Sequence, residues 1–329
     1  MKKALIVGID DYQVSPLSGC VNDAVAIANT LEKNGDGSPN FSIRLLTSNQ
    51  TEVSTAVLSS AISELFKGDA DTVLFFFAGH GIINPDTNAG YIVSQNGRKG
   101  SWGVSISEII GLSNKAYPYI KSTVIILDSC HSGFAGEVPA LVNEHISAIG
   151  SGVTILTACN RNGTAAEING HGLFTGMLLD GLGGSSADIC GRITPASVYS
   201  HIDQALGPWE QRPIYKANVQ TFVTLRQVNP KISLEILRRL PEYFPDATSY
   251  FRLDPSFEPD RANVPEEFKN IPVNEDNVRI FKELQSYNRH GLVIPVDAEH
   301  MFYAAIKSTG CKLTATGAHY RRLAAMNRI

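Results

Sequence analysis

Two short polar stretches follow apolar runs of the kind that fill a buried strand. The run "VIIL" at residues 124–127 leads into "DSCHSG", which presents Cys130 between an acid and small polar residues. The run "LFFF" at residues 74–77 leads into "AGHG", which places His80 between two glycines. A thiol and an imidazole are the nucleophile and the base of cysteine hydrolases. The sequence therefore predicts a Cys130–His80 pair if the two strands are neighbours in a sheet.

Other interpretations of these residues remain open. A buried cysteine is more often an inert core residue than a nucleophile. His131 follows Cys130 directly and is an alternative base. Successive side chains of an extended strand point to opposite sides, which favours His80 over His131. Gly81 lets the chain approach a substrate closely, and a peptide N–H beside the histidine can donate to an oxyanion.

The elements that must position these residues follow an alternating order. Four short apolar runs, at 4–9, 72–77, 124–127 and 153–156, are typical of strands buried on both faces of a parallel sheet. Helical spacing appears at 23–33, 53–66, 172–182 and 195–206, and residues 221–225 are expected to form a closing strand. This alternation predicts a doubly wound α/β fold. Ligands of such sheets bind beyond the carboxyl ends of the strands, where both polar stretches lie.

The composition excludes several classes of protein. The chain has 329 residues, of which 43% are hydrophobic and 18% charged, and a net charge of −4, so neither disorder nor a nucleic-acid partner is indicated. No apolar run reaches the roughly 20 residues of a membrane span, and the N-terminal run is too short for a signal peptide. The five cysteines are an odd number without a CxxC pair, which argues against a disulfide framework or a structural zinc site. We expect a cytoplasmic protein with no membrane partner, metal or cofactor.

A second domain is indicated near residue 230. Five prolines fall between residues 230 and 260, and residues 230–329 hold 14 Lys and Arg against 13 Asp and Glu. We therefore expect domains at 1–229 and 230–329. Residues 276–328, with a helix, a two-strand segment and "LTATG" before a last helix, resemble the end of a winged-helix module. The second domain is thus expected to be a smaller α+β regulatory or sensor domain.

The motifs of the first domain also resemble a known family. In order they are "ALIVGIDDY", "LSGCVNDA", "FFFAGHG", "VIILDSCHSG", "ILTACNRNGTAAE" and "HGLFTGMLLDGL". Over residues 1–227 this set is similar to the caspase-like cysteine proteases, above all the metacaspases and their bacterial relatives. The resemblance implies a caspase-type three-layer sandwich on a mainly parallel six-stranded sheet. It also implies a catalytic dyad of His80 and Cys130, with the peptide N–H groups of Gly81 and Cys130 as oxyanion donors.

The same resemblance implies which substrate is cut. Metacaspases cleave after Arg or Lys, and the matching pocket positions here are Asp23, Asp128 and Cys20. Two converging carboxylates repel each other, and a guanidinium relieves both. Asp23 could instead cap the helix that it begins. The alternative role of Asp128 is to hold the catalytic loop without contacting the substrate. Ala78 stands where many metacaspases have a serine, which leaves the choice between Arg and Lys open.

Activation is expected to differ from that of many relatives. Residues 82–103 contain a single acid, Asp86, so calcium activation is not expected. No Lys or Arg lies between Lys121 and Arg161, so an enzyme specific for basic residues would not cut its own linker there. Similar tails on bacterial defence proteins imply activation through the C-terminal domain, by a partner or a nucleotide. Two alternatives are a catalytically idle caspase-fold adaptor and a DNA-binding regulator.

Overall fold

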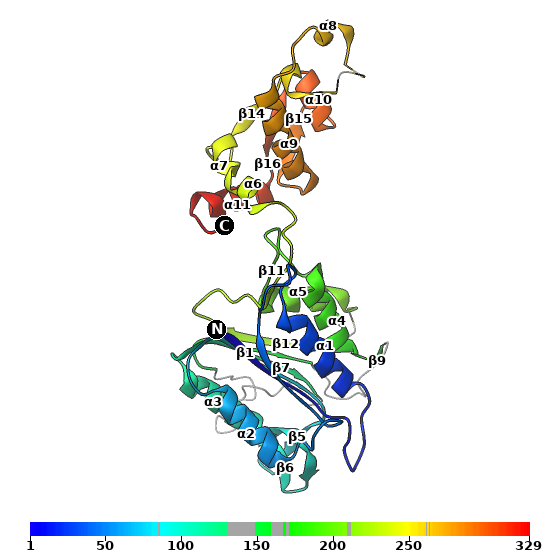
Figure 1. Cartoon of the computed structure of the whole chain (residues 1–329), viewed down its shortest axis with the longest axis vertical. Helices are drawn as coiled ribbons and strands as arrows, with labels where there is room; N and C mark the ends of the chain where they lie inside the picture. Colours follow the sequence, from blue (N-terminus) through cyan, green and yellow to red (C-terminus); the bar gives the residue numbers. More distant parts are fainter. Residues whose placement is uncertain are drawn as a thin grey trace. The chain divides into compact units, whose positions relative to one another are not determined.

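The computed structural model describes residues 1–84, 86–129, 149–158, 167–168, 171–208, 212–260, 262 and 264–329. These residues form two compact units, Met1–Asn229 and Pro230–Ile329. Figure 1 shows the chain coloured along its sequence, with the labels used below. Each unit has a core of its own.

The first unit is built on a six-stranded sheet with the strand order β12-β8-β7-β3-β1-β2. Five strands are parallel, and β12 runs antiparallel to β8 at one edge. The sheet is mainly parallel because its central runs are apolar at every position and can be buried on both faces. The α/β class and the six-stranded sheet are confirmed. The strands are β1 (Lys2–Gly8), β2 (Ser42–Thr47), β3 (Ala70–Ala78), β7 (Ile120–Asp128), β8 (Val153–Thr157) and β12 (Ile214–Asn218).

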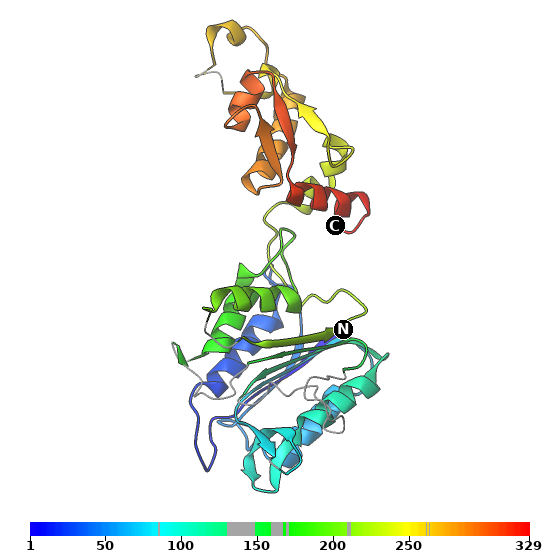
Figure 2. The same ribbon diagram turned by 180° about the vertical axis from the view of Figure 1, so that it is seen from behind.

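Helices cover both faces of this sheet, as Figures 1 and 2 show. One face carries α1 (Cys20–Glu32), α4 (Leu173–Asp180), a π-helical turn (Gly181–Ser185) and α5 (Pro195–Ala205). The other carries α2 (Thr55–Leu65) and α3 (Ile106–Ala116). Successive strand residues alternate between the two cores, so that Phe75 and Phe77 pack with α2 and α3 while Phe76 packs with α1 and α4.

The closing strand lies earlier in the chain than the sequence suggests. It is β12 (Ile214–Asn218), and the prediction of a strand at 221–225 is wrong. The segment "TFVTL" buries Val223 and Leu225 against the core under α1 and α4 while Phe222 stays exposed. Burial of alternate apolar residues therefore does not require strand pairing here. The chain pairs again directly afterwards, where β13 (Arg226–Gln227) lies antiparallel to β11 (Arg192–Ile193).

Two small antiparallel sheets flank the carboxyl ends of the central strands. The first follows β3 and consists of β4 (Gly81–Asn84), β5 (Ala89–Arg98) and β6 (Ser101–Ser105). The second pairs β9 (Glu167–Ile168) with β10 (His171–Gly172), which leads straight into α4. These segments lie next to the predicted catalytic and pocket residues.

The second unit has a three-stranded antiparallel sheet, β14-β16-β15. Its largest buried side chains include Phe244, Phe281 and Tyr287. A helix, α10, separates β15 from β16, so the two-strand segment expected near its end is a strand, a helix and a second strand. The elements are α6 (Leu234–Arg238), α7 (Leu240–Tyr243), β14 (Tyr250–Arg252), a 3-10 turn (Pro255–Phe257), α8 (Glu266–Lys269), α9 (Glu275–Arg289), β15 (Val293–Val296), α10 (Met301–Ile306), β16 (Gly310–Leu313) and α11 (Ala315–Ala325).

A buried ion pair joins α9 to the start of this unit. The guanidinium of Arg239 donates to both carboxylate oxygens of Glu283, at 2.9 and 2.6 Å, and the Tyr243 hydroxyl adds a bond of 2.8 Å. Glu283 is only 7% exposed, so this carboxylate depends on its partners for the hydrogen bonds that water would otherwise supply. The pair fixes α9 to the segment between α6 and α7.

Candidate active site

The described start of "DSCHSG", Asp128 and Ser129, lies beside "AGHG" at one edge of the central sheet. Strands β3 and β7 are parallel neighbours, with Ala78 opposite Asp128. The Gly79 N–H donates to the carbonyl of Asp128 at 3.3 Å. The condition that the two strands be adjacent is therefore met. Cys130 and His131 lie outside the described residues.

The loop after β1 holds the ring of His80. The Nε2 atom of His80 lies 2.6 Å from the carbonyl oxygen of Ser15. A carbonyl can only accept, so Nε2 carries the hydrogen and the neutral ring keeps Nδ1 as its basic nitrogen. The ring of Tyr12 packs against the imidazole, with centroids 4.5 Å apart. The imidazole is thus held in one tautomer and one orientation, as a general base requires.

The Tyr12 hydroxyl also takes the place of one main-chain hydrogen bond between His80 and Val93 of β5. The His80 carbonyl accepts from the Val93 N–H at 2.9 Å. The return bond runs through Tyr12, whose oxygen accepts from the His80 N–H at 3.0 Å and donates to the Val93 carbonyl at 3.1 Å. A Cβ at Gly79 would lie 2.5 Å from this hydroxyl, so the first glycine of "AGHG" leaves room for Tyr12.

Gly81 follows as the first residue of β4, opposite Ile92. Hydrogen-bonded and non-hydrogen-bonded pairs alternate in an antiparallel ladder. Because His80 and Val93 occupy a hydrogen-bonded position, the Gly81 N–H points away from β5. That direction suits a donor to a substrate oxyanion.

The predicted pocket residues come from the first turn of α1 and the end of β7. Helix α1 begins at Cys20, three residues earlier than its periodicity suggests. Its first N–H groups are capped by Asp10, whose carboxylate accepts from Cys20 at 2.9 Å and from Val21 at 3.1 Å. The alternative role of Asp23 as the cap is therefore wrong, because the capping acid comes from the end of β1. The Asp23 side chain points instead toward His171 and Gly172.

Asp23 and Asp128 converge on the junction between β10 and α4. His171 Nδ1 lies 2.6 Å from one oxygen of Asp23, and the Gly172 N–H donates to the other at 3.2 Å. The Thr175 hydroxyl donates to Asp128 at 2.6 Å. A Cβ at Gly172 would lie 3.0 Å from Asp128 Oδ2 and 3.4 Å from Asp23 Oδ2, so the glycine backbone packs over both carboxylates.

Burial makes this acidic pair costly to ionise. Burial raises the pKa of Asp128 to about 6, and the charge of Asp23 adds to the effect. Burial likewise raises the pKa of Asp23, against the opposing influence of His171. The pKa of the Cys20 thiol is raised by burial and by the nearby carboxylates, so Cys20 stays protonated beside the two acids. A cation at this place would stabilise both carboxylates.

Several residues of this site were not assigned a role from the sequence. They are Asp10, Tyr12, Ser15, His171 and Thr175. Asp10 and Tyr12 belong to "ALIVGIDDY" and His171 and Thr175 to "HGLFTGMLLDGL". The signal in the sequence that could have assigned them to the site was their position directly after a strand or at the start of a helix. Among the described residues, no group of three or more His, Cys, Asp and Glu is arranged to hold a metal ion.

Comparison with known proteins agrees with this architecture. A family model described as the caspase domain matches residues 1–223, and the chain therefore belongs to the caspase family of peptidases. The crystal structure of protein GSU0716 from Geobacter sulfurreducens is similar in fold, with a TM-score of 0.51 and 16% identity over 70% of this chain and 97% of that one. A comparison with curated proteins finds no match. No helix in the described part of the chain combines the length and the apolar character that a membrane span needs.

Proposed function

We propose that this member of the caspase family is a cysteine endopeptidase that cleaves proteins after Arg or Lys. The observation that carries the proposal is the convergence of Asp23 and Asp128 beside the strand end that holds an oriented His80. An imidazole with a basic Nδ1 suits proton transfer from a thiol, and the paired acids suit a guanidinium or ammonium group.

The proposed reaction has two steps. Cys130 passes its thiol proton to His80 Nδ1, and the sulfur attacks the scissile carbonyl carbon. The N–H groups of Gly81 and Cys130 stabilise the oxyanion until the C–N bond breaks and the leaving amine takes the proton from His80. Water then attacks the thioester with His80 as the base, which releases the acid and restores the thiol. The Ser15 carbonyl keeps the imidazole oriented throughout and stabilises its protonated form.

A profile of peptide cleavage tests this proposal. Peptides that differ only in the residue before the scissile bond are compared for the wild-type protein, Cys130→Ala and His80→Ala. Cleavage after Arg or Lys by the wild type alone is expected. Asp128→Asn should lower kcat/KM for these peptides roughly 100-fold, because a charge-assisted contact is lost. Hydrolysis after Asp, with none after Arg or Lys, contradicts the proposed pocket.

We also propose that the enzyme works as a single chain. The support is the absence of Lys and Arg between Lys121 and Arg161, which leaves a protease specific for basic residues no site in its own linker. Intact-mass measurement of the active enzyme should show no cut between residues 134 and 152. A cut there that accompanies activation contradicts this part of the proposal.

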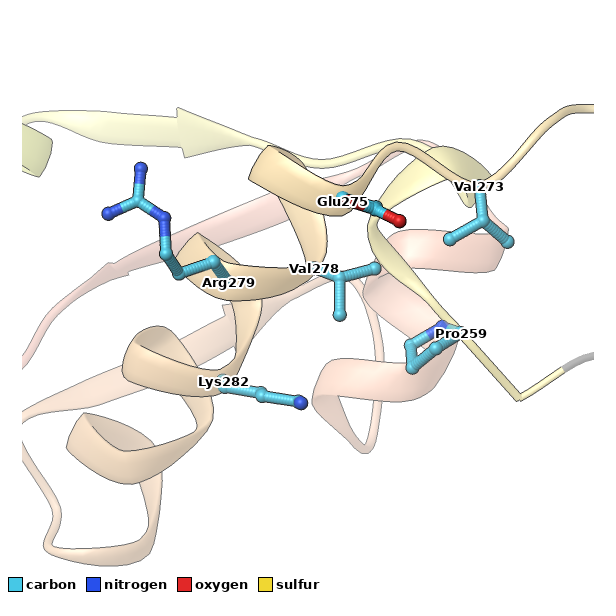
Figure 3. A pocket seen from close by; sticks show the side chains of 6 residues that line it. All are labelled: Pro259, Val273, Glu275, Val278, Arg279 and Lys282. Carbon is cyan, nitrogen blue, oxygen red and sulfur yellow. The ribbon is translucent and has the colours of Figure 1, made fainter.

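We propose that the protease is activated through the second unit, by the binding of a partner or a nucleotide. The proposed setting is bacterial defence or cell death. A groove of about 410 Å³ on α9 supports this proposal. Figure 3 shows the Lys282 ammonium pointing toward Pro259 while Arg279 points away from it. Apolar side chains beside a cation suit an anionic ligand that carries a ring. The groove is lined by Pro259, Val273, Glu275, Val278, Arg279 and Lys282.

Nucleotide-dependent cleavage tests the activation proposal. Peptide hydrolysis is measured with and without each of a panel of nucleotides, for the wild type and for Lys282→Glu. Stimulation that Lys282→Glu abolishes is expected, while Lys307→Glu, in the same unit but outside the groove, should respond as the wild type does. The proposed place of action is the cytoplasm, where reducing conditions would keep thiols such as Cys20, Cys190 and Cys311 free.

A further inference from the structure

Asp23 is covered by a histidine of the same chain. Asp23 is 3% exposed, and one of its carboxylate oxygens contacts His171 Nδ1 at 2.6 Å while the other accepts from the Gly172 N–H. A basic side chain of a substrate therefore cannot reach Asp23 while the imidazole of His171 stays where it is.

We propose that His171 is a specificity-determining residue of the acidic pocket, whose imidazole competes with the basic side chain of the substrate for Asp23. This inference rests on the proposed function, because it concerns the same pocket. In this proposal the substrate must displace the His171 imidazole from Asp23. The affinity for a basic side chain is then the difference between its contact with Asp23 and the contact of His171 with Asp23.

The surroundings of His171 allow this exchange. The residue lies in β10, a two-residue strand outside the central sheet that, among the described residues, pairs with β9 alone. Its side chain is 25% exposed, so it has solvent to turn into. The Gly172 N–H bond to Asp23 is made by the main chain and can persist when the imidazole rotates away.

The chemistry favours a strong cation as the displacing group. A neutral imidazole gives Asp23 one hydrogen bond, whereas a guanidinium gives it a full positive charge and two parallel donors. A guanidinium between Asp23 and Asp128 also offsets the repulsion of the two acids, which His171 relieves only on the Asp23 side. A neutral side chain gains neither advantage and is rejected.

The test compares His171→Ala with a matched histidine outside the site. His201 pairs with Asp180 at 2.7 Å, and its side chain is 24% exposed, nearly the same as that of His171. The inhibition constant of agmatine, a guanidinium compound without a scissile bond, is measured for the wild type, His171→Ala and His201→Ala. KM and kcat are measured with one arginine peptide.

In His171→Ala we expect the inhibition constant of agmatine and the KM to fall roughly tenfold with kcat unchanged, since a charge-assisted contact no longer has to be broken. His201→Ala should match the wild type. His171→Val, which has no hydrogen-bond donor for that oxygen, should behave like His171→Ala and serves if the alanine variant fails to fold. Unchanged or weaker agmatine binding in these variants overturns the inference. Absence of any wild-type cleavage after Arg or Lys would instead reject the proposed function.

Discussion

Tyr12 connects His80, the proposed catalytic base, to the sheet beside it, because its hydroxyl both accepts and donates a hydrogen bond. Its oxygen bridges the His80 N–H and the Val93 carbonyl, and its ring packs on the imidazole. Tyr12 is therefore a positioning residue for His80. It touches neither the substrate nor the sulfur in the proposed reaction.

Removal of that hydroxyl should loosen the histidine without changing the pocket. In Tyr12→Phe we expect kcat to fall about tenfold or more with KM unchanged, because the half-buried His80 N–H and Val93 carbonyl lose their partner. The rate at which iodoacetamide alkylates Cys130 at neutral pH should fall in parallel. Tyr199→Phe is the control and should behave as the wild type, since Tyr199 lies on α5 and stacks on Tyr215 of β12. A Tyr12→Phe enzyme with unchanged kcat would contradict this role.

The acid pair should make recognition of basic residues depend on pH. The pKa of Asp128 is raised to about 6 and that of Asp23 is raised as well, so both carboxyls bind protons more readily than ordinary acids. Below about pH 6 Asp128 is mainly neutral and attracts a guanidinium weakly. As pH rises through about 6 it gains its charge, and selection for a cation strengthens.

The ratio of kcat/KM for an arginine peptide to that for the matching citrulline peptide isolates this effect, since the dyad titrates equally in both. We expect the ratio to rise as pH increases from 5 to 7. In Asp128→Asn the rise should be largely lost. A ratio that is flat in the wild type would show that Asp128 does not contact the cation.

At the scale of elements, helix α1 is held by an acid from outside the helix. Asp10 lies two residues after the end of β1 and caps the N–H groups of Cys20 and Val21. The first turn that it fixes also carries Asp23. The cap thus links the stability of a helix to the geometry of the pocket.

Asp10→Ala should therefore have two consequences. The free energy of unfolding should fall by about 1 kcal/mol, as for other lost helix caps. KM for basic peptides should rise severalfold, because the turn that carries Asp23 is no longer held. Ser105→Ala, which removes the cap of α3 and its bond to the Glu108 N–H, should lose similar stability with KM unchanged. Equal kinetic effects in both variants would contradict the link.

The elements also show what the sequence could predict. The four apolar runs are strands, and the two polar stretches lie beyond neighbouring strands, because continuous burial leaves a clear pattern. The closing strand was misplaced because the segment "TFVTL" is as apolar as a strand yet packs without pairing. His171 and Tyr12 were missed because their partners lie far away in the sequence, and no local pattern encodes a contact of that kind.

At the scale of the whole molecule, the chain is two units with separate cores. Trp102 and Trp209 both fall within the range of the first unit, Met1–Asn229, although Trp209 lies outside the described residues, so we expect tryptophan fluorescence to follow the unfolding of that unit. The Arg239–Glu283 pair belongs entirely to the second unit. We therefore expect that stability changes in the two units can be measured separately in the intact two-unit chain.

Arg239→Met should destabilise the second unit by about 3 kcal/mol, because it leaves the buried Glu283 carboxylate with one fewer partner and no counter-charge. We expect unfolding of this unit, followed by circular dichroism, to shift to lower denaturant concentration while the tryptophan transition stays in place. Glu235→Gln, which alters the exposed end of the same network, should change either transition little. A shift of both transitions by the same amount in Arg239→Met would mean that the two units unfold as one.

The space beside Gly79 limits how the sequence of this protein can vary between species. Any side chain there would collide with the Tyr12 oxygen and with the ring of Phe77, so a larger residue at 79 is compatible only with a smaller one at 12 and an adjusted one at 77. Relatives that lack the tyrosine are therefore expected to tolerate alanine or serine before the histidine, whereas those that keep it should retain glycine. Three positions scattered along the chain are in this way expected to evolve as a single unit.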